Sequence, residues 1–309
     1  MEVRLRSGTN CLSTWDQFLQ FLLSGATVGS IYALIAIGFT IIYSCTQVVN
    51  FAQGEFVMLG AMTAAVLAAS TALPLPLIFL VTIVVVSIIG CLVAGSLLRP
   101  LRGNSIVTLI IITIGASILI RGSAMLLWGK DAMALRAFSE GYAYHIGGAS
   151  IHIQSPWVFV TATTLVVALW FFYRYTLVGR AMRACASCKP GAKLVGININ
   201  KMTVLSFALG AAIGAIAGFV VAPITFAQYD MGAMLGVKGF CAAILGGLGN
   251  FYGGIIAGLV LGILESMGAG FISSAYKDAI AFIILLFILF ARPQGVLRAK
   301  KVDRSIEEK

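Results

Sequence analysis

The segment RYTLVGRAMRACASCKPGAKLVGININK, residues 174–201, interrupts a very apolar chain and sets the orientation expected for the rest. Six of its side chains are basic and none is acidic: Arg174, Arg180, Arg183, Lys189, Lys193 and Lys201. Basic loops between membrane segments are retained on the cytoplasmic side of a membrane. The segment is also much longer than a tight turn requires. We therefore expect a structured cytoplasmic loop at about 174–202.

Small and apolar residues in this segment recur at helical spacing: Leu177, Ala181, Ala184, Cys188, Ala192 and Val195. The basic side chains of Arg180, Arg183 and Lys193 fall on the opposite side of the same helix. This pattern is typical of an amphipathic helix that lies along an interface or in the groove of a partner. We expect a cytosolic partner to act on the membrane part of the protein here.

The composition excludes an ordinary soluble domain and a disordered chain. Of the 309 residues, 60% are hydrophobic and only 10% are charged, and the mean hydropathy is +1.01. These values are typical of a polytopic membrane protein. The net charge of +10 would suit nucleic acid, but the basic residues lie in short loops beside apolar runs. There they fix the orientation of the chain in the membrane and contact lipid headgroups. We therefore expect membrane lipid and no nucleic acid as a partner.

Nine apolar segments are candidates for membrane helices, because a helix of roughly 20 apolar residues spans the bilayer core. They are approximately 18–43, 56–73, 77–98, 105–127, 156–173, 203–228, 235–249, 252–272 and 278–291. Segment 235–249 is short and contains Lys238. It either crosses the membrane or is a half-helix or re-entrant segment that enters and leaves on the same side. Counting it as a crossing places both the basic loop and the basic C-terminal tail in the cytoplasm. The sequence thus predicts one domain, 1–309, an all-α bundle of eight or nine membrane segments, with loop 128–155 outside.

The sequence NFAQG at residues 50–54 recurs as NFYGG at residues 250–254. Each copy precedes two apolar segments and an Arg-Pro, which indicates either an internal repeat or a coincidence of glycine-rich sequence. The glycines before the second copy lack the Lys-Ser/Thr of a phosphate-binding loop, so any ATP hydrolysis requires another chain. The glycine run at 246–254 is interpreted as a break between segments that serves as a gate or a plain turn, and Asn50 as part of a turn before a helix. The candidate translocation residues there are Asn50, Gln53, Gly54, Glu55, Gly246, Gly247, Gly249 and Asn250.

The few charges near membrane segments have structural interpretations. Glu55 lies where an acid at the start of a helix complements the helix dipole. Arg121 and Glu265 lie near predicted segment ends, from which long side chains reach the interface. The pair Cys185 and Cys188 has no second pair or histidine beside it, so we expect no metal, no cofactor and no catalytic residue.

Glycines spaced four residues apart form two ladders, Gly210/Gly214/Gly218 and Gly254/Gly258/Gly262, and Gly25/Gly29 begin a third. Small residues at this spacing let helix backbones approach closely inside a membrane. We expect most of this packing to lie within one subunit, with packing against a partner permease as the alternative.

Several stretches together resemble a known family. GSIYALIAIG at 29–38 and VNFAQGE at 49–55 resemble the opening of permease subunits of branched-chain amino acid ATP-binding-cassette (ABC) importers, the LivH type. GRAMRACA at 179–186, AAILGGLG at 242–249 and PQG at 293–295 continue the likeness in family order. The resemblance implies a multi-pass protein of the cell inner membrane with the ABC permease fold. It also implies a second related permease, two ABC ATPase subunits inside and an extracytoplasmic solute-binding protein.

In this resemblance, residues 179–196 are similar to the coupling helix that docks on the ATPase. The implied ATPase-coupling residues are Arg180, Arg183, Ala184, Ala186, Lys193 and Gly196. The family commonly has histidine at position 53 and acids at 187 and 188, whereas this chain has Gln53, Ser187 and Cys188. We therefore assign no proton chemistry to Gln53 and leave the identity of the ATPase open.

The resulting hypothesis is a non-enzymatic permease that translocates leucine, isoleucine and valine by alternating access. The alternatives are a permease for urea, short amides or other amino acids, an ion-coupled carrier or channel, and a purely structural scaffold.

Overall fold

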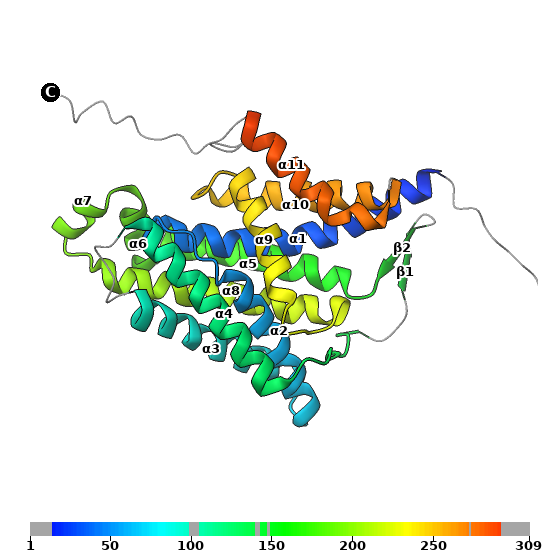
Figure 1. The fold of residues 1–309 in the computed structure, drawn as a ribbon, viewed down its shortest axis with the longest axis horizontal. Coiled ribbons are helices and arrows are strands. Elements are labelled where there is room, and N and C mark those ends of the chain that lie inside the picture. The colour runs from blue at the N-terminus through cyan, green and yellow to red at the C-terminus, as the bar shows by residue number, and fades with distance from the viewer. Residues whose placement is uncertain (1–13, 99–104, 140–142, 147–148, 272, 292–309) are drawn as a thin grey trace, which may run out of the picture.

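The computed structural model describes residues 14–98, 105–139, 143–146, 149–271 and 273–291. Its helices are α1 Thr14–Thr46, α2 Gln53–Ser70, α3 Leu75–Leu92 with the π-helical extension η1 Val93–Leu98, α4 Ile106–Trp128, α5 Ser155–Tyr175, α6 Leu177–Ser187, α7 Lys189–Leu194, α8 Ile199–Thr225, α9 Met231–Leu245, α10 Phe251–Phe271, the 3-10 helix η2 Ser274–Tyr276 and α11 Lys277–Ala291. Strands β1 Ala143–Ile146 and β2 Ala149–His152 form an antiparallel hairpin. The arrangement is shown in Figure 1.

Seven of the described helices are long and apolar enough to cross a membrane: α1, α2, α3, α4, α5, α8 and α10. The remaining predicted segments, 235–249 and 278–291, correspond to α9 and α11, each a helix of 15 residues in the described chain. A helix of that length extends about 22 Å, less than the roughly 30 Å of a bilayer core. The all-α polytopic bundle is confirmed. The hairpin in the predicted external loop is an addition that the sequence did not predict.

Helices α1, α2 and α8 form the centre of the bundle, and α1 runs along its long axis (Figure 1). Within the most apolar window of each helix, 89% of α1, 72% of α2 and 67% of α8 are buried, against 22% of α4 and 17% of α5. The outer helices leave large apolar side chains exposed, such as Ile118 and Leu126 of α4. Such faces are compatible with lipid or a neighbouring subunit, since neither requires a polar surface.

The glycine ladders join the central helices directly. A Cβ atom placed on Gly29 of α1 would lie 2.8 Å from the Cα of Leu259 in α10, and one on Gly218 of α8 would overlap the carbonyl oxygen of Val57 in α2. Backbones this close exclude any side chain at these positions. The prediction that the ladders pack mostly within the subunit is therefore confirmed.

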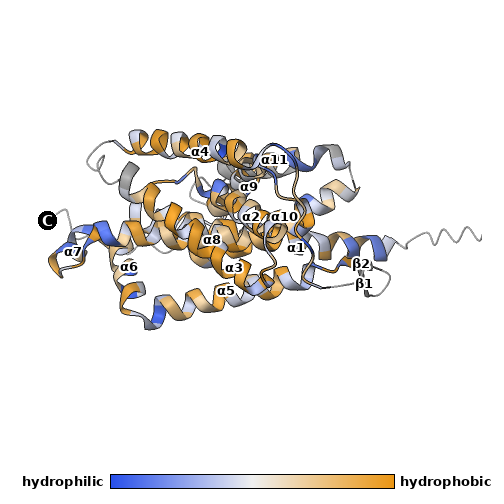
Figure 2. Cartoon of the chain, turned by 90° about the horizontal axis from the view of Figure 1, so that it is seen from below, coloured by the Kyte–Doolittle hydropathy of each residue, from blue (hydrophilic) through white to orange (hydrophobic). Residues whose placement is uncertain are grey.

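The two ends of the bundle differ in construction. Hydrophilic residues gather at α6 and α7 at one end, and around the start of α1 and the hairpin at the other, with apolar helices between them (Figure 2). At the hairpin end, Gln20 of α1 donates to the carbonyl of Ser150 at 2.7 Å and accepts from its N–H at 2.6 Å. This pair of bonds attaches β2 to the longest helix, so the hairpin is fixed to the bundle.

Candidate functional site

The basic segment folds as two short helices, α6 and α7, joined at Cys188. Thr176 caps α6 by accepting from the N–H of Gly179 at 3.0 Å, and the Cys188 sulfur accepts from the N–H of Gly191 at 3.4 Å. Cys188 itself is extended, with φ −152° and ψ 103°. Pro190 lies in the first turn of α7, where proline is tolerated because the N–H it lacks would have no helical partner. It therefore helps to begin α7.

The buried side of α6 differs from the apolar stripe expected for one continuous helix. It consists of Gly179, Met182 and Cys185, whereas Leu177 and Cys188 of the expected stripe are exposed. A Cβ atom on Gly179 would overlap the carbonyl oxygen of Phe172 at the end of α5, so this position must face the bundle. The close approach of α5 sets the rotation of α6, and hydropathy spacing alone could not reveal it.

The predicted coupling residues lie on or near the free side of this helix pair. Arg180, Arg183, Ala186, Lys193 and Gly196 are exposed, and Ala184 is half-buried. Gly196 has φ +81°, and its N–H donates to the carbonyl of Lys193 at 3.0 Å, which ends α7 in a left-handed conformation that favours glycine. Leu194 and Val195 beside it are 89% and 74% exposed, so apolar side chains accompany the cations on this surface.

Contacts join the helix pair to the central bundle. The Nζ of Lys189 donates to the carbonyl of Thr46, the last residue of α1, at 2.8 Å. Met182 is 1% exposed and packs in one cluster with Ile37, Ile41 and Ile213. The helix pair is therefore in direct contact with α1 and α8.

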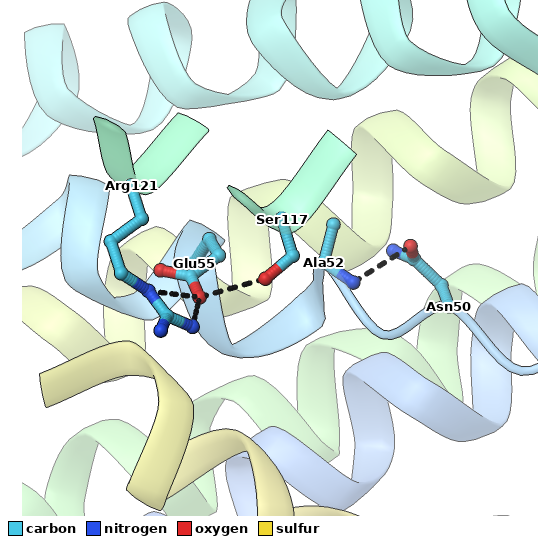
Figure 3. Close-up of polar contacts among 5 residues, drawn as sticks. All are labelled: Asn50, Ala52, Glu55, Ser117 and Arg121. Carbon is cyan, nitrogen blue, oxygen red and sulfur yellow. Dashed lines mark hydrogen bonds and ion pairs between the residues drawn. The ribbon is translucent and has the colours of Figure 1, made fainter. Parts of the chain in front are cut away.

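The two echoed stretches have similar local geometry. Asn50 precedes α2 and its Oδ1 accepts from the N–H of Ala52 at 3.2 Å, a contact drawn in Figure 3. Asn250 precedes α10 and its Oδ1 accepts from the N–H of Gly253 at 3.2 Å. Both asparagines satisfy backbone donors at a helix start, as capping residues do. The Arg-Pro dipeptides that follow each stretch lie outside the described residues.

Gln53 and Gly54 lie inside the subunit. Gln53 is fully buried and its Nε2 donates to the carbonyl of Gly210 in α8 at 2.9 Å. A Cβ atom on Gly54 would overlap the carbonyl oxygen of Gly232 in α9. These two candidate translocation residues therefore hold α2 against α8 and α9.

Glu55 occupies the first turn of α2, as predicted, but its carboxylate binds α4 (Figure 3). Its Oε1 accepts from Ser117 at 2.9 Å and from the Nη2 of Arg121 at 2.5 Å. Arg121 pairs with this buried acid, a partner that the expectation of a side chain reaching the interface did not include. Glu55 is 1% exposed and the Arg121 side chain 34%, beside a cavity of about 280 Å³.

The second glycine stretch forms a sharp turn between α9 and α10. Gly247 and Gly249 have φ of +84° and +90°, a region that side chains rarely adopt. A Cβ atom on Gly246 would overlap the backbone of Gly253, so the turn is also tightly packed. The positive φ angles and the tight packing account for glycine at these positions without a bound ligand.

A group of paired charges on α9, α10 and α11 was missed by sequence reasoning; Lys238 and Glu265 are buried, and Asp278 is about half-exposed. The Nζ of Lys238 lies 2.7 Å from the Oε1 of Glu265 and 2.6 Å from the Oδ1 of Asp278. Glu265 is 0% exposed, so the expectation that it reaches the interface is wrong. The available signal was Lys238 itself, since a cation within an apolar segment requires an acidic partner.

The cysteines and histidines form no reactive centre in the described residues. No group of three or more His, Cys, Asp or Glu side chains there could hold a metal ion. Cys185 is buried and Cys188 exposed, both as free thiols. Burial raises the pKa of the Cys185 thiol, and nearby Lys189 partly opposes this change.

Comparison of the sequence with known proteins identifies the family of the chain. Residues 21–289 match the family described as branched-chain amino acid transport system / permease component. The chain is 34% identical to the high-affinity branched-chain amino acid transport system permease protein LivH of Escherichia coli K12, over 93% of this chain and 97% of that protein. It is also 34% identical to the permease protein BraD of Pseudomonas aeruginosa, over 93% of this chain and 98% of that protein.

A more distant relative is the ribose import permease protein RbsC of Haemophilus influenzae, 29% identical over 84% of this chain and 81% of that protein. No solved structure matches the chain. Matches that extend along almost the whole sequence and all of the central bundle cannot come from one shared motif. The chain belongs to the family of permease components of branched-chain amino acid transport systems, as a multi-pass membrane protein.

Proposed function

We propose that this chain is a permease subunit of an ABC importer in the cell inner membrane and that it translocates leucine, isoleucine and valine. The observation that carries the proposal is the 34% identity to LivH and BraD over 93% of the chain. Both relatives are named as high-affinity branched-chain amino acid permeases. The chain supplies a path for the solute, and the chemistry of ATP hydrolysis belongs to a partner.

The charge distribution supports an orientation with α6 and α7 in the cytoplasm. Residues 174–202 carry six basic side chains and no acid. The start of α1 and the connections that follow α4 and α8 carry charges of both signs in their described residues: Asp16, Lys130, Asp131, Arg136 and Asp230. Short basic loops are retained inside the cell. The hairpin then faces outward, where a solute-binding protein would dock.

The proposed complex has two ABC ATPase subunits. One of them contacts the helix pair α6–α7 of this chain, and the other contacts a second, related permease. Exposed cations and exposed Leu194 and Val195 supply a mixed polar and apolar surface of the kind that protein interfaces use. The bond from Lys189 to Thr46 and the packing of Met182 give movement of the pair a direct route into α1. Rocking of the central helices would open the path to alternate sides.

Uptake of labelled solutes tests this function. The complex with its partner subunits is reconstituted in vesicles, and leucine, isoleucine, valine, ribose and urea are supplied with the binding protein and ATP. Branched-chain amino acids are expected to accumulate only with ATP. Accumulation of ribose instead would favour the activity for which the relative RbsC is named. Movement of solute through the purified chain alone, without ATP, would establish a channel or carrier and contradict the proposal.

A further inference from the structure

A cavity of about 490 Å³ opens where α6 meets the ends of α1 and α5 and the start of α10. Two cations from different helices line it, Arg174 from α5 and Arg183 from α6. The other residues used in the argument are the aromatic Trp170, Tyr173 and Tyr252 and the apolar Leu169, Ile41 and Phe251. The cavity therefore combines positive charge with an apolar wall, and its lining contains no acidic residue.

The two guanidinium groups have no anionic partner in the described part of the chain. Neither forms an ion pair or a side-chain hydrogen bond there. Arg174 instead lies over the Trp170 ring, with 5.1 Å between its Cζ and the ring centroid, and 5.7 Å from the Tyr175 centroid. The stacking orients Arg174 and leaves its donors available. Arginine donors match the geometry of phosphate and carboxylate oxygens.

The aromatic residues indicate the depth of the cavity in the membrane. Tryptophan and tyrosine concentrate where the apolar core meets the headgroups, because their rings are apolar and their tips are polar. Trp170, Tyr173 and Tyr175 occupy the last two turns of α5, a helix long enough to span a membrane, immediately before the basic segment. Phe171 and Tyr175 are 51% and 60% exposed, so the outer side of α5 presents rings at this level.

We propose that this cavity binds an anionic phospholipid, with its phosphate between Arg174 and Arg183 and an acyl chain along the wall formed by Leu169 and Ile41. An acidic segment of an ATPase subunit is the competing occupant. The apolar wall of Leu169, Ile41 and Phe251 favours lipid, because an acyl chain covers apolar surface there that an acidic peptide segment would leave exposed to water. The inference does not depend on the transported solute. It gives different roles to Arg183, which lines the cavity, and Arg180, which is exposed and does not line it.

The test measures which lipids the full-length chain retains, by native mass spectrometry after exchange into mixed phosphatidylglycerol and phosphatidylcholine. We expect wild type to prefer phosphatidylglycerol by on the order of 30-fold for two cations near a membrane surface. Arg174→Gln/Arg183→Gln should reduce the preference to about twofold, the remainder that unspecific surface charge gives. The control Arg180→Gln removes one charge from α6, as Arg183→Gln does, but outside the cavity lining, and should keep the wild-type preference.

Three results would overturn the proposal: an unchanged preference in the double variant, an equal loss in Arg180→Gln, or displacement of the lipid by millimolar inorganic phosphate, which would indicate a free-anion site. Should the double variant fail to fold, wild-type protein is photo-crosslinked with a reactive phosphatidylglycerol. Labelled peptides should then come from residues 169–174, 183 and 252. Labelling elsewhere, or cross-links from these residues to an ATPase subunit in the assembled complex, would favour the competing occupant.

Discussion

The two ends of this bundle are built from the same few kinds of residue but have different designs. At the α6–α7 end, cations and apolar side chains are exposed together without any acid in the segment. At the hairpin end, charges of both signs occur, and Gln20 binds the hairpin to α1 with two short hydrogen bonds. Unpaired exposed charge is typical of a surface that awaits a partner, whereas internally bonded polar groups make a surface complete in itself. This difference agrees with the proposal that the α6–α7 end receives force from the ATPase and that the hairpin end is a fixed platform.

Charge reversal at the α6–α7 end should have the largest effect. Arg180→Glu/Lys193→Glu is expected to lower ATP-dependent uptake at least about tenfold and to abolish co-purification of the ATPase subunits, because two exposed cations of the proposed contact are then replaced by anions. Lys130→Glu at the opposite end is the matched control and should retain the ATPase. Equal loss in both variants would remove the distinction between the ends.

The interior that connects the ends should be the next most sensitive part. Glu265→Gln leaves the buried Lys238 with the half-exposed carboxylate of Asp278 as its acidic partner, so the loss of unfolding free energy should approach, and stay below, the about 3–5 kcal/mol expected for a buried charge without a partner. Glu55→Gln should cost clearly less, because Arg121 is about one-third exposed and can reach water. Thermal unfolding in detergent measures both, and a larger loss in Glu55→Gln would contradict this order.

The smallest effect is expected at the hairpin. Gln20→Ala removes two hydrogen bonds to Ser150, each with a net value of about 1 kcal/mol. The hairpin should become more sensitive to added protease while the ATPase stays bound. If the variant hairpin resists protease as well as the wild-type hairpin does, other contacts hold the hairpin in place.

Composition and hydropathy were sufficient to predict the bundle, because membrane helices must satisfy their backbone internally and are therefore long apolar runs. The glycine ladders were also readable, since small residues at four-residue spacing have one main use in a membrane. The short length of α9 followed from the same pattern. These are properties of single segments.

Properties that join distant segments could not be predicted. Lys238 and Glu265 are 27 positions apart and meet only through the packing of α9 on α10. The rotation of α6 depends on the backbone of α5 at Phe172, which places Gly179 against the bundle. Glu55 at a helix start matched the rule for capping, yet Arg121 lies 66 positions further on and takes its carboxylate. Side-chain partners across helices decide the site, and spacing along one helix cannot supply them.

The side of the membrane on which α6 and α7 lie tests the central claim most directly. Cys188 is exposed, whereas Cys185, one turn earlier, is buried and its raised pKa keeps the thiol protonated and slow to react. In variants that retain one of these cysteines, a membrane-impermeant maleimide is applied to inside-out and right-side-out vesicles. We predict rapid labelling of Cys188 only in inside-out vesicles and protection when the ATPase subunits are bound. Labelling of Cys188 from the outside, or no protection by the ATPase, would contradict the account.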